Sequence, residues 1–254
     1  MILRSITKHV RDQNWFAVGL DFFIVVFGVF VGLQVQQWST ERTADAHEIK
    51  LLGELRTELE NSITVTTGRI DSFTQVGEAA QRSLEFLESG DDCGDDCWQF
   101  VIDFFHASQW QSISAPRITF DEMRREGLPR SRAVIEAVES HHVEISALAY
   151  TMNILPKYRN LVRGLIPLTI HDIYWIQCYK FEANKETYDL ECPQSVPAEM
   201  SARTIAAIKA HPDIIPTLTV WAGDIRSTPV SLVDGIEDAE RAIAAIDKEL
   251  ERRK

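Results

Sequence analysis

Residues 15–38 read WFAVGLDFFIVVFGVFVGLQVQQW, an apolar segment with a tryptophan at each end. The only charged residue between Trp15 and Leu33 is Asp21. An α-helix rises about 1.5 Å per residue, so the segment would span roughly 35 Å, close to the thickness of a bilayer with its interfaces. Trp15 and Trp38 fit the interfacial belt of a membrane protein. The segment therefore predicts a transmembrane helix.

The charges on the two sides of this segment predict its direction. Residues 1–14 hold three basic residues against one acidic residue, whereas residues 39–50 hold two basic residues against three acidic ones. The positive-inside rule then keeps residues 1–14 in the cytoplasm as a tail and exports residues 39–254. The predicted organisation is a cytoplasmic tail over 1–14, a signal-anchor helix over 15–38 and a periplasmic helical domain over 39–254.

Two other interpretations of the segment remain open. It could be a core helix of a soluble protein, although such a helix rarely follows a basic leader. It could also be a cleaved signal sequence, with Ala44-Asp45-Ala46 as the cleavage site. That triplet lies well past the apolar run and inside a polar helical stretch, so an uncleaved anchor is favoured.

Composition limits the classes of partner. The chain of 254 residues is 45% hydrophobic and 25% charged, enough for one exported domain with a hydrophobic core. Its net charge is −12, and the leader and anchor together carry three basic and two acidic residues, which leaves −13 on the exported part. Such an acidic surface repels phosphate backbones, so nucleic acid is not an expected partner.

The four cysteines are Cys93, Cys97, Cys178 and Cys192. An even number in an oxidising compartment predicts two disulfides. Of the three possible connectivities, Cys93 with Cys97 and Cys178 with Cys192 is favoured because each bond closes a short polar loop. A zinc site with four cysteine ligands is the alternative, and the uneven spacing of the second pair weighs against it.

The exported part is predicted to be mainly α-helical. Residues 40–89 read as one long helix with a coiled-coil-like stripe of apolar or small residues at spacings of three and four. Its members are Leu52, Leu55, Leu59, Ile63, Thr66, Ile70, Phe73, Gly77, Ala80, Leu84 and Leu87.

Further helices are expected over about 98–110, 118–127, 131–155, 197–210 and 212–226. Residues 165–181 fit either strand or helix, and residues 186–197 read as a loop. Thr228 is expected to cap a last helix that starts at Pro229, ends near 252 and runs antiparallel to residues 45–75. The predicted fold is a transmembrane helix continuing into a stalk helix and a helical bundle.

The apolar segment also carries a candidate contact face. Gly28 and Gly32 form a GxxxG pattern, which lets two helices approach closely in lipid. Asp21, Val25, Gly28, Gly32 and Val35 share one helix face by their spacing. A carboxylate in hydrocarbon is costly, so Asp21 favours a helix partner on this face, with snorkelling to the interface as the alternative. The expected partners are the bilayer and either a second copy or another membrane protein.

No pattern for chemistry stands out in the rest of the chain. No phosphate-binding loop, dinucleotide-binding glycine turn, nucleophile elbow or HExxH sequence is present. His141 and His142 are adjacent, point about 100° apart on a helix and read as ordinary surface helix rather than as metal ligands. The sequence therefore predicts no catalytic residue, no metal site and no cofactor.

The start of the chain resembles a family of bacterial single-pass membrane proteins that has no assigned function. The resemblance rests on the acidic residue and the glycines of the anchor, on the glutamines and tryptophan at its C-terminal end, and on a short helix later in the chain. The matching residues are Asp21, Gly28, Gly32, Gln34, Gln37, Trp38, Thr119–Met123 and Gly127. This resemblance implies a single-pass protein of the bacterial inner membrane.

Three functional hypotheses follow. The favoured one is a scaffold or accessory subunit that binds an envelope protein and would show an exposed apolar patch. A periplasmic ligand sensor working through a partner subunit would show a sealed apolar pocket between helices. An envelope hydrolase would bring carboxylates such as Asp121, Glu122 or Glu144 together in a cleft.

Overall fold

The computed structural model describes residues 15–182 and 185–253, and the side chains of residues 15–19 and 21 lie outside this description. The chain divides into two compact units, residues 1–51 and 52–254. In the first unit, residues 15–51 form the beginning of helix α2 (Trp15–Ser89). The large hydrophobic side chains of α2 from Phe22 to Leu33 are all exposed. One helix in the described residues is thus apolar and long enough to cross a membrane.

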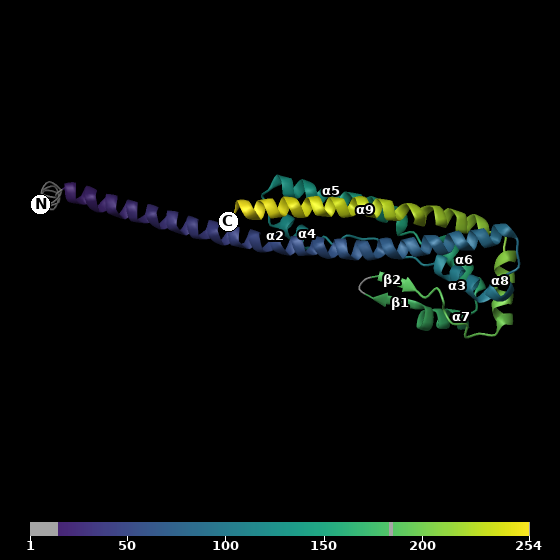
Figure 1. Cartoon of the computed structure of the whole chain (residues 1–254). Coiled ribbons are helices and arrows are strands. Elements are labelled where there is room, and N and C mark those ends of the chain that lie inside the picture. The colour runs from purple at the N-terminus through teal and green to yellow at the C-terminus, as the bar shows by residue number, and fades with distance from the viewer. Residues whose placement is uncertain (1–14, 183–184, 254) are drawn as a thin grey trace, which may run out of the picture. The chain divides into compact units, whose positions relative to one another are not determined.

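The second unit is mainly α-helical, as predicted (Figure 1). After α2 come, in chain order, the short helix η1 (Gly94–Asp96), α3 (Cys97–Ala107), α4 (Ile118–Arg125), α5 (Arg132–Met152), α6 (Lys157–Leu165), α7 (Leu168–Ile173), the π-helical turn η2 (Tyr174–Cys178), strands β1 (Tyr179–Glu182) and β2 (Lys185–Tyr188), α8 (Ala198–Ala210) and α9 (Ile214–Arg252).

The predicted stripe on residues 52–87 faces the protein interior. Leu52, Leu55 and Phe73 are at most 1% exposed, and no member of the stripe is exposed. Gly90, with a φ of 73°, follows the last turn of α2, a backbone conformation that favours glycine. The amphipathic pattern therefore identified both the helix and its buried face.

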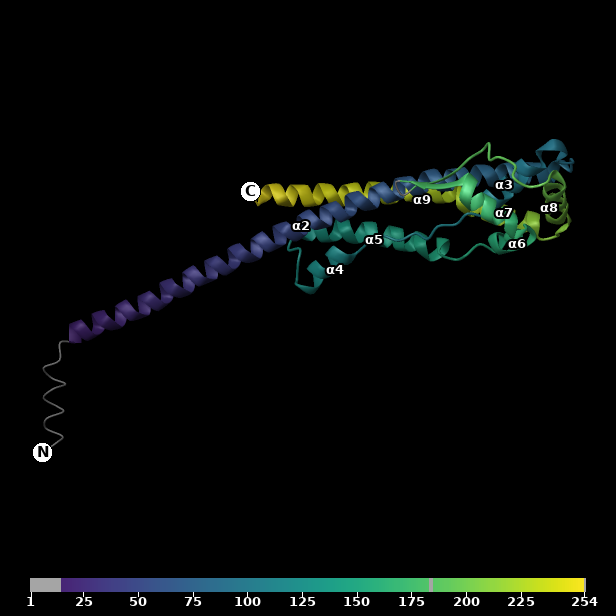
Figure 2. The ribbon, with the colours of Figure 1, turned by 90° about the horizontal axis from the view of Figure 1, so that it is seen from below.

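Helices α9 and α5 lie along this part of α2 (Figures 1 and 2). Arg56 pairs with Asp247 at 2.7 Å. Arg226 donates to Gln81 at 3.1 Å. These contacts show that, within this unit, α9 runs antiparallel to α2, as predicted for its pairing with residues 45–75.

The predicted break in the last helix is wrong. Helix α9 is continuous from Ile214 to Arg252, with Pro229 inside it. A proline removes one backbone hydrogen bond, here to the carbonyl of Ile225. The surrounding turns are held by other contacts, because Thr228 Oγ1 donates to the Asp224 carbonyl at 2.9 Å and to Met152 Sδ on α5 at 3.2 Å. Thr228 is therefore a buried interior residue and not a helix cap.

The predicted loop after residue 185 is also wrong in its first part. Residues 185–188 form β2, which pairs antiparallel with β1 in the register Tyr179 with Tyr188 and Glu182 with Lys185. The undecided stretch before it divides into α7, η2 and β1. The hairpin is fastened to α2, since Ser72 Oγ accepts from the Glu186 amide at 2.9 Å.

Candidate functional site

Charged and polar side chains converge where the end of α3, helix α6 and the β-hairpin meet. Arg159 and Arg163 lie one turn apart on α6. Arg163 Nε donates to Ser108 Oγ at 2.8 Å, and Arg163 Nη2 donates to Gln109 Oε1 at 3.1 Å. Arg159 Nη1 donates to the carbonyl of Ser108 at 2.7 Å. We call Arg159, Arg163, Gln109 and Glu186 the arginine cluster.

Burial and mutual repulsion act on the two arginines. Burial, followed by the neighbouring charge of Arg159, lowers the pKa of Arg163 to about 10. Burial also lowers the pKa of Arg159. The Arg163 guanidinium lies 4.6 Å from the ring centroid of Phe105 and 5.4 Å from that of Trp175, which are cation–π contacts. Both arginines stay charged near neutral pH, in a partly desolvated setting.

Glu186 on β2 faces the two arginines without touching them. Gln111 and Tyr179 form hydrogen bonds with its carboxyl group. Burial raises the pKa of Glu186, and these hydrogen bonds and the charges of Arg159 and Arg163 oppose that rise. Within residues 15–182 and 185–253, Glu186 forms no ion pair with either arginine. Opposite charges therefore influence each other here without forming an ion pair.

A second polar network lies beside the cluster, and its side chains bind one another. Arg82 on α2 binds Asp103 on α3 through both carboxylate oxygens, with Nη2–Oδ1 at 2.7 Å and Nε–Oδ2 at 3.0 Å. The Tyr188 hydroxyl donates to the same carboxylate at 3.1 Å and also contacts Arg82. The hydrogen bond to Asp103 raises the pKa of Arg82 above its ordinary value. This network joins α2, α3 and β2.

His106 on α3 contacts two tyrosines of this region, Tyr174 and Tyr188. Its Nδ1 is 2.6 Å from the hydroxyl of Tyr174, and its ring stacks on Tyr188 with centroids 3.4 Å apart. Burial, and then the charge of Arg82, lowers the pKa of His106 to about 3. The imidazole is therefore neutral at physiological pH. No hydrogen-bond partner of its Nε2 occurs among the described residues.

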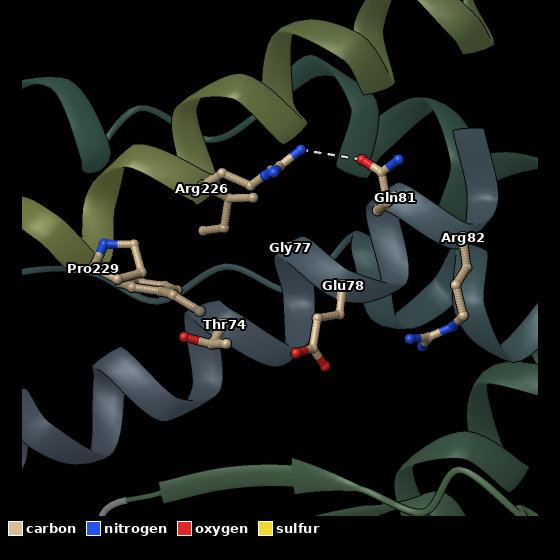
Figure 3. A pocket seen from close by; sticks show the side chains of 9 residues that line it. Thr74, Gly77, Glu78, Gln81, Arg82, Arg226 and Pro229 are labelled. Carbon is tan, nitrogen blue, oxygen red and sulfur yellow. Dashed lines mark hydrogen bonds between the residues drawn. The ribbon is translucent and has the colours of Figure 1, made fainter. Parts of the chain in front are cut away.

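Two open grooves flank helix α9. The α2–α9 groove, of about 440 Å³, lies between residues 73–82 and 225–229 (Figure 3). Gly77 forms part of its floor, because a Cβ at this position would come within 3.2 Å of Arg226 Cγ. Glu78, Arg82 and Arg226 bring charge to the groove, and Figure 3 shows the hydrogen bond from Arg226 to Gln81.

The second groove lies between α9 and the end of α5. This α5–α9 groove, of about 670 Å³, is mostly apolar. Ile154 and Val220 on its rim are 68% and 67% exposed. Its other apolar residues are Leu148, Met152, Leu155, Pro156, Pro216 and Trp221. The groove is open, unlike the sealed pocket expected of a ligand sensor.

The predicted helix contact face has an uncovered backbone. A Cβ built at Gly28 or Gly32 would meet nothing within 4 Å. Val25 and Val35 are 64% and 58% exposed. The Asp21 side chain lies outside the described residues, so its pairing stays a prediction. Of the two tryptophans predicted at the ends of the span, Trp15 has a side chain outside the described residues. Trp38 packs under Arg42, whose guanidinium is 4.2 Å from the ring centroid.

The cysteines lie in the favoured pairs at disulfide distance. The Cα atoms of Cys93 and Cys97 are 4.8 Å apart, and those of Cys178 and Cys192 are 5.2 Å apart. Cys178 ends η2 and Cys192 follows the hairpin, so the second pair closes the base of the element that carries Glu186.

The histidine pair differs from its prediction. His141 and His142 are 2% and 1% exposed, so they are buried and not part of a surface helix. They are buried because α5 packs along α9 and against the segment before α4. His141 Nδ1 lies 3.0 Å from the Gly235 carbonyl, and the two ring nitrogens of His142 lie 2.8 and 2.9 Å from the carbonyls of Val138 and Pro116.

The carboxylates named for a hydrolase do not build a site. Asp121 on α4 is exposed and pairs with Arg117 at 3.3 Å, and Glu122 is exposed beside it. Neither these residues nor Glu144 line the two grooves. In the part of the chain that the structure describes, no three His, Cys, Asp or Glu side chains are placed to hold a metal ion.

The arginine cluster was missed from the sequence. The available signal was the basic pair one helical turn apart in YRNLVRG, since equal charges at this spacing disfavour a helix unless something compensates them. Glu186 gave no signal, because it lies in the stretch read as a loop.

Known proteins do not identify the chain. Comparisons with protein-family models, curated proteins and solved structures give no match. The resemblance to a family of single-pass membrane proteins therefore stays a prediction, and function has to be argued from the geometry above.

Proposed function

We propose that this chain is a membrane-anchored interaction protein of the bacterial inner membrane. Residues 15–38 would span the bilayer with the tail over 1–14 in the cytoplasm. The helical domain over 39–254 would lie in the periplasm and bind another envelope protein, as a scaffold or accessory subunit. The helix face from Asp21 to Val35 would contact a second copy or a membrane partner.

The exposure of the apolar segment carries this proposal. Helix α2 contains an 18-residue window of mean hydropathy 1.5, and none of that window is buried. In a soluble protein, an apolar core helix is covered by the rest of the chain, whereas a bilayer provides such cover for a membrane span. The excess of basic residues in the leader supports the cytoplasmic position of the N-terminus.

The exported unit supports binding rather than catalysis. The α5–α9 groove presents apolar side chains to solvent, and such surfaces mark contact sites for proteins or ligands. The ion pair of Arg82 with the buried Asp103 joins secondary-structure elements, and Asp103 is 2% exposed. A polar network of this kind stabilises the packing of the domain's elements.

Two measurements test the proposal. Alkaline carbonate should leave the full-length protein in the membrane pellet, and its N-terminus should begin at residue 1 or 2. A photoreactive amino acid at Val220, in the groove, should crosslink to a distinct envelope protein, whereas one at exposed Glu199 on α8 should not. Release by carbonate would contradict the anchor, and equal crosslinking at both positions would contradict a specific partner surface.

The arginine cluster favours a second candidate function, a periplasmic ligand sensor. Partly buried charges of both signs that do not touch are arranged for a polar ligand. Such a sensor would act through a partner subunit. Loss of a ligand response after removal of the partner, with binding intact, would support this role.

A further inference from the structure

We propose that Arg159, Arg163 and Gln109 form a binding site for the carboxylate group of a small organic monoanion. This site is not implied by the anchor or by protein binding, and it stands if either of those proposals fails. It rests on the supply of hydrogen-bond donors, on the balance of charge and on the surrounding aromatic rings.

The cluster offers more donors than its neighbours accept. Arg159 uses Nη1, and Arg163 uses Nε and Nη2, in the hydrogen bonds of the described residues. Gln109 is 3% exposed, and its Oε1 is occupied by Arg163. Its Nε2 is buried and has no hydrogen bond of good geometry there, although Gln109 lies close enough to the Tyr174 hydroxyl to oppose the rise of that group's pKa.

A buried donor without an acceptor, here Gln109 Nε2, is unfavourable, so the site favours a ligand that accepts hydrogen bonds. The planar fork of a guanidinium matches a carboxylate through two parallel bonds. Arg159 and Arg163, one turn apart on α6, keep guanidinium nitrogens beyond those used in these hydrogen bonds, and together with the amide donor of Gln109 they suit a carboxylate group.

The charges select a monoanion. Two arginines face one carboxyl group, that of Glu186, which leaves one excess positive charge when all three are ionised. The neighbouring Asp103 is already neutralised by Arg82. A single carboxylate balances the excess, whereas Glu186 would repel the second charge of a phosphate dianion. A bound carboxylate would also relieve the repulsion between two cations one turn apart on α6.

Aromatic rings indicate that the ligand has an apolar body. Phe105 and Trp175 lie against the Arg163 guanidinium, and Trp175 is 39% exposed. A carboxylate held by the arginines would place the attached group beside these rings. An aromatic or aliphatic monocarboxylate fits both the donors and this wall.

The test uses the full chain in phosphatidylcholine nanodiscs and isothermal titration, with empty nanodiscs as the blank. The probes are benzoate, its neutral relative benzamide, and inorganic phosphate at pH 7.5. We expect saturable binding of benzoate, at least tenfold weaker binding of phosphate and no binding of benzamide. Arg159→Gln should weaken benzoate binding at least tenfold. Arg132→Gln, at an arginine that is 89% exposed and far from the cluster in the sequence, should leave it unchanged.

A second variant separates binding from folding. Arg163→Lys keeps the charge but loses the fork, so it should weaken benzoate binding while cooperative unfolding persists. Benzoate binding by Arg159→Gln equal to that of the unmodified protein would overturn the site. Equal binding of benzamide, or no saturable binding of benzoate by the unmodified protein, would overturn it too. Phosphate binding as tight as that of benzoate would overturn the assignment to a monocarboxylate.

Discussion

Arg82 and Asp103 form a two-pronged ion pair that joins α2 to α3, with one carboxylate oxygen shared by the hydroxyl of Tyr188. The two residues are 21 positions apart, and the carboxylate is 2% exposed. The pair fixes the region in which the arginine cluster and the hairpin lie, because it engages both helices and β2 at once.

Asp103→Asn should therefore destabilise the protein strongly. It leaves the Arg82 guanidinium without its counter-ion, and breaking a largely buried pair costs about 3 kcal/mol. Partial exposure of Arg82 to solvent limits the loss. The matched control is Asp247→Asn, which breaks the half-exposed pair with Arg56 and should cost much less. Urea unfolding of both variants measures the difference, and equal losses would contradict a dominant role for Asp103.

Protonation of His106 should destabilise the fold in acid. Burial and the charge of Arg82 lower its pKa from 6.5 to about 3, so between these values the unfolded chain binds more protons than the folded one. Stability is then greatest above pH 6.5 and falls as the pH drops toward 3, by up to about 1.4 kcal/mol per pH unit for one proton.

The variant His106→Gln tests this dependence. A glutamine side chain does not titrate, so the decline in melting temperature between about pH 6.5 and pH 4 should become shallower than in the unmodified protein. An identical slope for His106→Gln and the unmodified protein would show that other groups cause the acid sensitivity.

The proposed export of residues 39–254 predicts that both cysteine pairs are oxidised in the cell. Intact-mass analysis of protein made with its own anchor should find no free thiol. Cys178→Ser with Cys192→Ser opens a loop of about 15 residues and should cost about 3 kcal/mol, whereas opening the Cys93–Cys97 loop of about 5 residues should cost about 2 kcal/mol. Four free thiols would contradict the disulfides and weaken the periplasmic assignment.

Self-association of the anchor is expected to depend on its glycines. Gly28→Ile or Gly32→Ile places a branched side chain where the backbones would meet, so either change should reduce dimer formation by a peptide of residues 10–40 in a bilayer. Val31→Ile, outside the predicted face, is the control. A peptide that is monomeric whether or not the glycines are replaced would exclude self-association through this helix and leave a different membrane protein as the partner.

Local patterns predicted much of the fold. The buried stripe from Leu52 to Leu87 follows from its spacing, and Gly90 and Gly127 both adopt positive φ just after helices end. The errors arose where tertiary contacts override local signals. Pro229 resembles a helix start, yet packing on α2 and α5 keeps α9 continuous.

The candidate site was harder to predict than the fold. Arg159, Glu186 and Gln109 belong to α6, β2 and the segment after α3, and no short motif connects them. The burial of His141 and His142 likewise depends on contacts with Gly235 and Pro116, which are distant in sequence. Residues that act through long-range convergence need the fold before they can be found.

Topology tests the central claim most directly. Alkaline phosphatase, which is active only in the periplasm, and a green fluorescent protein that is fluorescent only in the cytoplasm are each fused after Lys254 in the full chain. The account predicts an active phosphatase and a dark fluorescent fusion, with the protein retained in the membrane after alkaline extraction. A bright fluorescent fusion with an inactive phosphatase would contradict an anchored protein with an exported domain.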